Sequence, residues 1–426
     1  MLTPVRSDVN GIMGKRCSES EGKSLALTKM NMPGTKQTIV KNGGSNAEDP
    51  LLDTLNSGPS GRWIVEPTSD GYALHRIEKD VRGVYIEVTT RCNLKCSNCV
   101  RNVWDEPLAD MEPETFERIM ESLRELPDLR EVHFGGFGEP LLHPDLPEMV
   151  KRVKALGVRV SLITNGTLLD EEKITALMDS KLDRLFVSMD STQPELFSEI
   201  RGGADLNLVL ENLKRVRAWR DRKGSRMPTI GLEAVVTDKN LNDVKRLPSL
   251  AREVGASIIL LTHLLPHTEK SASRIAYGEN STEIPQPEGW PVMAGDYVMW
   301  GTLSAPRSNW GAYRRCRFIN DKRLVIGWDG GVSPCYALLH SYPYFIFGDR
   351  KQVTHYVIGN VNDSSLADIW TSREYVLFRA MVADFRFPSC VDCGANCDYR
   401  QKNEDCWVNA PSCADCLWAQ DIIRCP

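Results

Sequence analysis

Between Val84 and Pro266 the sequence alternates between short runs rich in β-branched residues and longer segments with an apolar residue at every third or fourth position. This alternation is typical of repeated strand–helix units. The expected strands are VYIEVTT, REVHFGG, VRVSLIT, RLFVSMD, TIGLEAVV and SIILLTH. Parallel neighbours need crossover connections, so these units predict an α/β fold with a parallel sheet. Six units are too few to close an eight-stranded barrel, and we therefore expect a partial (β/α)6 TIM-like barrel.

The helices between these strands are located by their apolar stripes and end signals. One helix is expected after Glu112, with Pro113 at its first position and an apolar stripe behind it. The next begins near Asp145 and stops at Gly157, where a left-handed residue commonly ends a helix. Further helices are expected near 170–180, 206–222 and 240–254. In such folds the functional residues lie on the loops that follow the carboxyl ends of the strands.

Composition excludes several classes of function. The chain has 426 residues, with 42% hydrophobic and 26% charged residues, as in an ordinary soluble protein of two or three domains. Lysine and arginine number 52 against 57 aspartate and glutamate, so there is no excess positive charge for binding nucleic acid. No apolar run reaches the roughly 18 residues of a membrane span, and the amino terminus lacks a secretory pattern. We expect a cytoplasmic protein with no membrane segment.

The cysteines divide the chain into regions. Of the 13 cysteines, Cys17 stands alone, three lie between Cys92 and Cys99, and nine follow residue 315. A reducing cytosol disfavours disulfides, so clustered thiols indicate metal sites, and the isolated Cys17 is assigned no role. The expected regions are a flexible arm at 1–60, a lead-in at 61–83, the barrel at 84–266, a connector at 267–315 and a small cysteine-rich domain at 316–426.

The loop after the first strand carries the triplet Cys92-x3-Cys96-x2-Cys99. Three thiolates can bind three irons of a four-iron cluster and leave the fourth iron without a protein ligand. An open metal position is where a small molecule binds and reacts. Zinc is the alternative, but a structural zinc site takes four ligands, and the next cysteine in the sequence is Cys316. The triplet therefore favours a cluster site.

Polar residues also follow the next three strands. The second strand leads into Gly138-Glu139, the third ends at Asn165, and the fourth ends in Ser188 and Asp190. Each of these patterns alone is more typical of turn or cap chemistry, because Asn-Gly and Asp-Ser favour such positions on any fold. Their common place at one rim of the sheet favours a ligand-binding role, with a carboxylate available for an ammonium group.

Taken together, these motifs resemble the radical S-adenosylmethionine (SAM) enzymes over roughly residues 84–266. The resemblance implies that Cys92, Cys96 and Cys99 bind a [4Fe-4S] cluster whose open iron is chelated by the amino and carboxylate groups of SAM. Many members have an aromatic residue before the last cysteine, where this chain has Asn98, so adenine would be bound differently here. The cofactor-binding residues implied by the resemblance are Gly138 and Glu139 for the methionine ammonium, Ser188 and Asp190 for the ribose, Asn165 for a ribose or carboxylate group, and Arg201 for the carboxylate.

The same resemblance implies a reaction. One electron from the cluster cleaves the sulfonium of SAM and yields methionine and a 5′-deoxyadenosyl radical, which abstracts hydrogen from an unactivated position of the substrate. The electron would come from reduced ferredoxin or flavodoxin. The protein would bind the cofactor, orient the substrate and exclude water.

The nine cysteines after residue 315 are enough for two further clusters with four cysteine ligands each, although spacing alone allows two zinc ions equally well. The pattern is similar to the SPASM extension of radical SAM maturases, which implies two auxiliary [4Fe-4S] clusters. It departs from that pattern in its middle run, which reads CxxCx3C rather than CxxCx5Cx3C. The implied ligands are Cys316, Cys335, Cys390 and Cys393, with the remainder drawn from Cys397, Cys406, Cys413, Cys416 and Cys425.

The strings TTRCNLKCSNCVRNVW and CVDCGANCDYRQKNEDCWVNAPSCADCLWAQDIIRCP are similar to the maturases of tungsten-containing aldehyde ferredoxin oxidoreductases. This resemblance implies a peptide or protein-associated substrate and a tungsten-containing oxidoreductase as partner. Modification of a ribosomal peptide by a crosslink, thioether or epimer is the alternative enzymatic hypothesis. An electron-transfer or metal-stapled scaffold protein is the hypothesis of another class, but it leaves the incomplete triplet without a purpose.

Overall fold

The computed structural model describes residues 62–69, 71–277, 314–346, 349–390, 393 and 403–426, together with the backbone of three short strands between 293 and 304. Cys17, Cys397, the predicted arm at 1–60 and most of the predicted connector lie outside the described residues.

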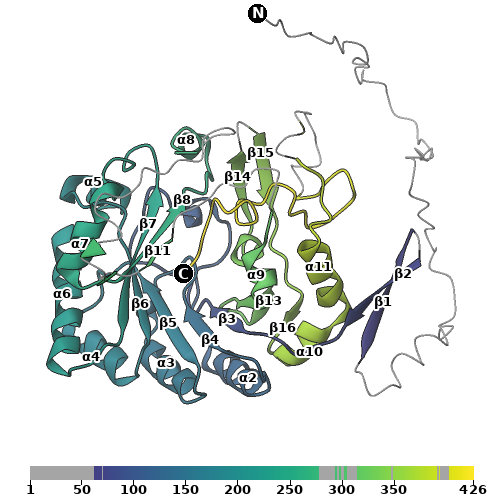
Figure 1. Ribbon diagram of the computed structural model, residues 1–426, viewed down its shortest axis with the longest axis horizontal. Helices are drawn as coiled ribbons and strands as arrows, with labels where there is room; N and C mark the ends of the chain where they lie inside the picture. Colours follow the sequence, from purple (N-terminus) through teal and green to yellow (C-terminus); the bar gives the residue numbers. More distant parts are fainter. Residues whose placement is uncertain are drawn as a thin grey trace, which may run out of the picture.

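All six predicted parallel strands are present and pair in the order of the sequence. Each strand pairs in parallel with the next, as an α/β fold requires. The predicted fold class is thereby confirmed, and Figure 1 shows the strands as a curved sheet with helices along its outer side. The strands are β3 (Gly83–Ile86), β4 (Glu131–Phe134), β5 (Arg159–Thr164), β6 (Arg184–Ser188), β7 (Thr229–Val236) and β8 (Ile258–His263).

The predicted helices follow, with two differences. The short helix α5 (Pro194–Ile200) was not predicted, and α7 (Leu247–Val254) begins later than 240, after a 3-10 turn at Val244–Arg246. The side chain of Asn240 explains the late start, because it donates to the backbone oxygens of Asp190 and Val235 and so fixes an irregular loop. The other helices are α2 (Pro113–Arg124), α3 (Leu146–Lys154), α4 (Glu171–Asp179) and α6 (Leu206–Arg222).

The C-terminal region continues the barrel sheet. Strand β12 (Arg323–Ile326) pairs in parallel with β3, and β13 (Gly331–Ser333) and β16 (Gly359–Asn360) follow it in antiparallel pairs. At the other edge, β11 (Thr302–Ser304) pairs in parallel with β8. Ten of the described strands therefore form one open sheet, in which the cysteine-rich region is joined directly to the strand that precedes the cysteine triplet.

The remaining elements are short. The hairpin β1 (Trp63–Thr68) and β2 (Gly71–Arg76) lies on α11 (Arg373–Ala383), as Figure 1 shows at the right. Buried residues of the barrel and of the cysteine-rich region belong to one hydrophobic cluster, so the two regions share a core. The other elements are β9 (Met293–Ala294), β10 (Tyr297–Val298), β14 (Tyr342–Ile346), β15 (Asp349–Val353), α8 (Glu269–Ala272), α9 (Arg317–Asn320) and α10 (Leu366–Thr371), with 3-10 turns at Val100–Val103, Pro140–Leu142 and Tyr336–Leu338.

A search of the described helices for one that combines the length and the apolar character of a bilayer span found none.

Candidate active site

A cavity of about 260 Å³ lies at the carboxyl ends of the barrel strands. Its wall combines the cysteine triplet, the residues that follow the neighbouring strands, and the end of the chain from Ile423 to Pro426. The predicted site residues that it brings together are Cys92, Cys96, Cys99, Gly138, Glu139, Asn165, Ser188, Arg201 and Cys425.

The triplet loop begins earlier than predicted, because β3 ends at Ile86 although β-branched residues continue to Thr90. The backbone of Glu87 donates to Ile326 of β12, and the Thr89 hydroxyl donates to Asp110 at 2.6 Å, so the chain leaves the ladder with β4. Farther along, Ser97 donates its backbone N–H to the carbonyl oxygen of Ile200 at 2.8 Å, which ties the loop to the end of α5. The three thiols are thus held by contacts on two sides.

The thiols of the triplet are suited to bind metal only as thiolates. Burial raises the pKa of the Cys96 thiol to about 11 and also raises that of Cys99, while nearby arginines lower both. Metal binding displaces the thiol protons, so the binding of iron would offset the free-energy cost of forming buried thiolates. Among the described residues, no three His, Cys, Asp or Glu side chains converge on a point that would hold a single metal ion. A four-iron cluster has a different requirement, since each thiolate binds its own iron.

The loop after β4 packs tightly on the triplet loop. A side chain at Gly138 would place its Cβ 2.1 Å from the backbone oxygen of Thr89, so glycine is required there by close approach of two loops. The next residue, Glu139, donates its backbone N–H to the oxygen of Arg91 at 2.7 Å. The glycine therefore sets the distance between the cysteine loop and the glutamate.

The Glu139 carboxyl group is buried and largely occupied by hydrogen bonds. Its oxygens accept from the backbone of Leu141 at 3.0 Å, the hydroxyl of Thr164 at 2.7 Å and the backbone of Asn165 at 2.7 Å. Burial nevertheless raises the pKa of this carboxyl group above its usual range. A carboxylate has about four acceptor sites, so one site remains for a donor in the cavity.

Asp190 and Arg201 form a largely buried ion pair at the cavity wall. Arg201 Nε lies 2.7 Å from Asp190 Oδ2, and Asp190 is fully buried. The other oxygen of Asp190 accepts the backbone N–H of Val235 at 2.8 Å. Burial alone would lower the pKa of Arg201, but Asp190, Cys96 and Glu233 raise it. Asp190 is not among the residues that line the cavity, whereas Ser188 and Arg201 are.

Among the titratable residues of the cavity wall that were not predicted from the sequence are Glu233 and His263. Glu233 of β7 faces the cavity, and burial raises the pKa of its carboxyl group to about 8. His263 ends β8, and burial lowers the pKa of its imidazole to about 4. A single histidine carries no spacing signal in a sequence that would separate a functional role from a structural one.

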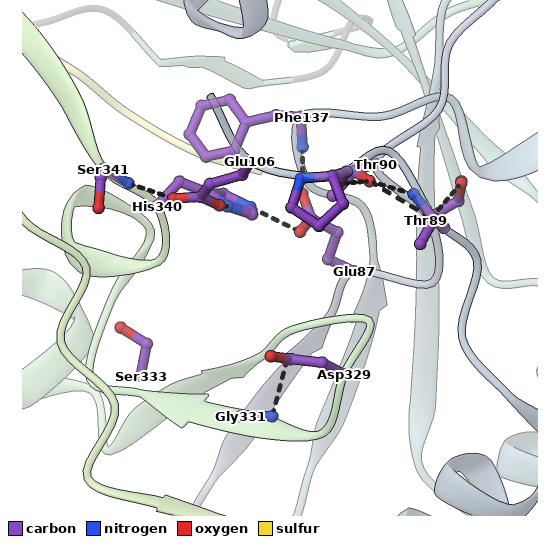
Figure 2. Close-up of polar contacts among 12 residues, drawn as sticks. Glu87, Thr89, Thr90, Glu106, Phe137, Asp329, Gly331, Ser333, His340 and Ser341 are labelled. Carbon is purple, nitrogen blue, oxygen red and sulfur yellow. Dashed lines mark hydrogen bonds and ion pairs between the residues drawn. The ribbon is translucent and has the colours of Figure 1, made fainter. Parts of the chain in front are cut away.

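A second missed feature joins the cysteine-rich region to the cofactor loops, as Figure 2 shows. His340 Nε2 lies 2.7 Å from Glu87 Oε2, and its Nδ1 contacts Glu106. Glu87 also accepts the backbone N–H of Phe137 at 2.7 Å, next to Gly138. His340 is buried and its ring lies 4.0 Å from that of Trp104. Burial alone would lower the pKa of His340, but the two carboxylates raise it to about 9.

We call the group formed by Glu87, Glu106 and His340 the His340 clamp. Its Glu87 side chain also leaves no space for a side chain at Gly136 in the loop after β4. A Cβ at Gly136 would lie 2.4 Å from Glu87 Oε1. The nearby Asp329 accepts the backbone N–H of Gly331 at 3.0 Å in a tight turn (Figure 2).

Four thiols of the cysteine-rich region interact electrostatically, as their pKa shifts show. They belong to Cys316, Cys335, Cys413 and Cys416, which we call the buried quartet. Burial raises the pKa of Cys335 and Cys413, and the other thiols of the quartet raise it further. Lys351 is buried beside them in an ion pair with Asp415 and lowers the pKa of Cys413 and Cys416. Cys390, Cys393 and Cys406 are more accessible to solvent, and Cys397 lies outside the described residues.

Comparison with known proteins identifies the family. Residues 86–229 match the model of the radical SAM superfamily, and residues 316–398 match SPASM, an iron–sulfur cluster-binding domain. The chain is 37% identical over 349 residues to the tungsten-containing aldehyde ferredoxin oxidoreductase cofactor-modifying protein of Pyrococcus furiosus, covering 80% of this chain and 96% of the relative. The chain belongs to the radical SAM superfamily.

Two further relatives of this radical SAM enzyme are informative. The PqqA peptide cyclase of Granulibacter bethesdensis is 28% identical, over 78% of this chain and 87% of the relative. The crystal structure of Streptococcus suis SuiB bound to S-adenosylmethionine has the same fold, with a TM-score of 0.54 at 16% identity, covering 72% of this chain and 69% of SuiB. The predictions of a radical SAM enzyme, of SAM and iron–sulfur clusters as its cofactors, and of a SPASM region are confirmed.

Proposed function

We propose that this enzyme is a radical SAM/SPASM maturase that cleaves SAM reductively and abstracts hydrogen from a peptide or protein-associated substrate. The observation that carries the proposal is the single cavity that joins three thiols, the Glu139 carboxyl group and the end of the cysteine-rich region. When bound, the cluster and SAM together supply a 5′-deoxyadenosyl radical. The residues of the chain bind and orient the cofactor and exclude water from the cavity.

In this proposal Cys92, Cys96 and Cys99 bind the SAM-associated cluster. Asn165 supports the loop, since its side-chain N–H donates to Asn93 at 2.8 Å and lies 3.9 Å from the sulfur of Cys92. Hydrogen bonds to cluster sulfurs tune the cluster potential.

SAM would lie against the remaining polar residues of the cavity wall. Glu139 has one acceptor site left for the methionine ammonium group, and the buried Arg201 offers its guanidinium to the carboxylate. Ser188, at the end of β6, is placed to meet the ribose. Asp190 acts one step away, because it pairs with Arg201 and thereby fixes the guanidinium in place.

The auxiliary clusters would divide the remaining cysteines by position. The buried quartet supplies four thiols that influence one another electrostatically and is suited to one closed cluster with four cysteine ligands. Cys390, Cys393, Cys397 and Cys406 lie within one short segment of sequence and are assigned to the second.

The substrate assignment rests on the relatives. One relative is a modifying protein for the cofactor of a tungsten enzyme, and another is a peptide cyclase. We propose that this enzyme matures a tungsten-dependent oxidoreductase or its cofactor, with reduced ferredoxin or flavodoxin as electron donor. Modification of a ribosomal peptide remains the second candidate, favoured by the likeness to the peptide cyclase.

The first test is direct. Anaerobically reconstituted and reduced protein is incubated with SAM, and methionine and 5′-deoxyadenosine are quantified. Formation of both supports the radical function, and their absence contradicts it.

The substrate is tested by co-expression. The enzyme is produced together with a tungsten-containing aldehyde ferredoxin oxidoreductase, or with a candidate small peptide, and the masses of the partners are measured. An enzyme-dependent mass change in the peptide, with an unchanged oxidoreductase and cofactor, would favour peptide modification over tungsten-enzyme maturation.

A further inference from the structure

Cys425 is left over when the cysteines are assigned to clusters. Nine cysteines follow residue 315, and two clusters with four cysteine ligands each require eight. The buried quartet and the segment from Cys390 to Cys406 provide eight ligands without Cys425. The structure also places Cys425 elsewhere, in the wall of the cavity that contains the cysteine triplet.

The position of Cys425 is fixed by its neighbours in the chain. The Arg424 backbone N–H donates to the hydroxyl of Thr262 at 2.9 Å, and the His263 backbone N–H donates to the oxygen of Ile422 at 3.1 Å. These bonds hold the segment against the end of β8. The sulfur of Cys425 accepts the indole N–H of Trp418 at 3.3 Å, and Trp418 lines the same cavity.

The charged residues around Cys425 connect it to the SAM side of the cavity. Besides burial, the charge of Glu233 raises the pKa of Cys425. Burial raises the pKa of Glu233, and the charge of Arg201 lowers it. Arg201 also lowers the pKa of Cys96 in the triplet, which burial raises. The thiol therefore shares one cavity with Glu233, Arg201 and the cysteine triplet.

A second observation marks this side as a ligand site. His263 lines the cavity and is only 2% exposed, and its ring Nδ1 has no hydrogen-bond partner among the described residues. Buried polar atoms are nearly always paired in folded proteins, so an unpaired ring nitrogen facing a cavity indicates a partner supplied by a bound molecule. The cavity thus presents an unpaired polar group next to the segment that carries Cys425.

We propose that Cys425 is a catalytic thiol that gives a hydrogen atom to a substrate carbon radical, and that it is not a cluster ligand. This inference rests on the proposed radical function. The S–H bond of Cys425 breaks homolytically, its hydrogen atom forms a C–H bond on the substrate, and the sulfur is left as a thiyl radical. One electron from a low-potential iron–sulfur donor and one proton from solvent restore the thiol. Burial in the cavity wall keeps the sulfur protonated between turnovers.

The test needs no substrate. In its absence the 5′-deoxyadenosyl radical formed from SAM meets the thiol directly, and the thiol proton exchanges with solvent. Reduced, reconstituted wild type and the Cys425→Ser variant are incubated with SAM in D2O, and the deuterium content of 5′-deoxyadenosine is measured by mass spectrometry. We expect one deuterium per molecule from wild type and loss of that label in the variant. Serine keeps an acceptor for Trp418 but holds its hydrogen too strongly to donate it.

Iron content and a second variant complete the test. Tyr336→Phe removes another O–H group from the cavity wall, and we expect the label to be retained. Equal labelling in wild type and Cys425→Ser, or loss of label in Tyr336→Phe instead, overturns the proposal. A fall of about four irons per chain in Cys425→Ser also overturns it, because Cys425 would then be a cluster ligand. Absence of 5′-deoxyadenosine from wild type is a distinct failure, since it overturns the radical function on which the proposal rests.

Discussion

The cysteine triplet and the buried quartet, which we propose to bind iron–sulfur clusters, lie in opposite settings. The triplet lies on a loop at the strand ends and faces a cavity of about 260 Å³, and Cys92 and Cys99 are partly exposed. Cys316, Cys335 and Cys413 of the quartet are buried in the core that the barrel shares with the cysteine-rich region. The triplet lacks a fourth thiol, whereas the quartet has its full set.

The difference shows how a protein separates reactive from supporting metal sites. An open site needs space, a free coordination position and residues that bind the incoming molecule, the role that we propose for Glu139 and Arg201. A closed site needs a full set of ligands and burial, and it then contributes to folding.

The largest effect is expected at the open site. Cys96→Ser removes one of the three proposed cluster ligands. Mutation of a residue that only supports a ligand typically lowers metal affinity or activity by roughly 10- to 100-fold, so loss of a direct ligand should lower SAM cleavage further. We expect no 5′-deoxyadenosine above the protein-free background, with the melting temperature of the chain nearly unchanged. Residual SAM cleavage near the wild-type rate would show that Cys96 does not hold the cluster.

The closed site should respond in the opposite way. Cys335→Ser leaves an incomplete cluster site in the shared core, and we expect a loss of about four irons per chain together with a clearly lower anaerobic melting temperature. SAM binding by the folded fraction, measured by equilibrium dialysis, should persist. If Cys335→Ser instead removed SAM binding and left the melting temperature unchanged, the contrast between the two sites would be broken.

The largely buried ion pair at the cavity wall comes next. Asp190→Asn leaves the Arg201 guanidinium buried without its counter-charge, and breaking such a pair costs about 3–5 kcal/mol of unfolding free energy. Denaturant titration of the variant measures this loss. Glu78→Gln is the matched control, because its pair with Arg76 is exposed and should contribute at most about 1 kcal/mol. Equal losses in the two variants would contradict a positioning role for Asp190.

The smallest effect is expected at the His340 clamp, which connects the two sites. The pKa of His340 is raised from 6.5 to about 9 in the folded protein by Glu87 and Glu106. A raised pKa means that the stabilisation is complete below pH 6.5 and is lost as the pH rises through about 9. In His340→Gln this pH-dependent part, at most about 3 kcal/mol, should disappear from the unfolding free energy. An identical pH profile in wild type and variant would show that His340 is neutral in the fold.

The sequence predicted most of what depends on local pattern. The triplet and Gly138-Glu139 are contiguous motifs, and the six parallel strands follow from apolar periodicity. The end of β3 was misplaced, because Thr89 and Thr90 favour a strand by residue type but use their hydroxyls to bind the loop at 107–110. At such positions tertiary hydrogen bonds override the strand propensity of the residues.

Long-range features left no comparable signal. The pairing of β12 with β3 joins segments about 240 positions apart, and the three members of the His340 clamp come from three separate segments. A single histidine or glutamate has no repeated spacing in the sequence, so such a cluster cannot be predicted from it. The short helix α5 did carry a signal, since Pro194 and Glu195 stand at its start, but its length of seven residues kept it below the periodicity needed for a prediction.

The decisive measurement is the anaerobic iron, sulfide and zinc content of wild type and of the Cys92→Ala/Cys96→Ala/Cys99→Ala variant. We expect about twelve irons per chain in wild type and about eight in the variant, with the auxiliary clusters kept and SAM binding lost. Zinc without iron, unchanged by the triple substitution, would contradict this expectation and would indicate a metal-stapled scaffold in place of a radical enzyme.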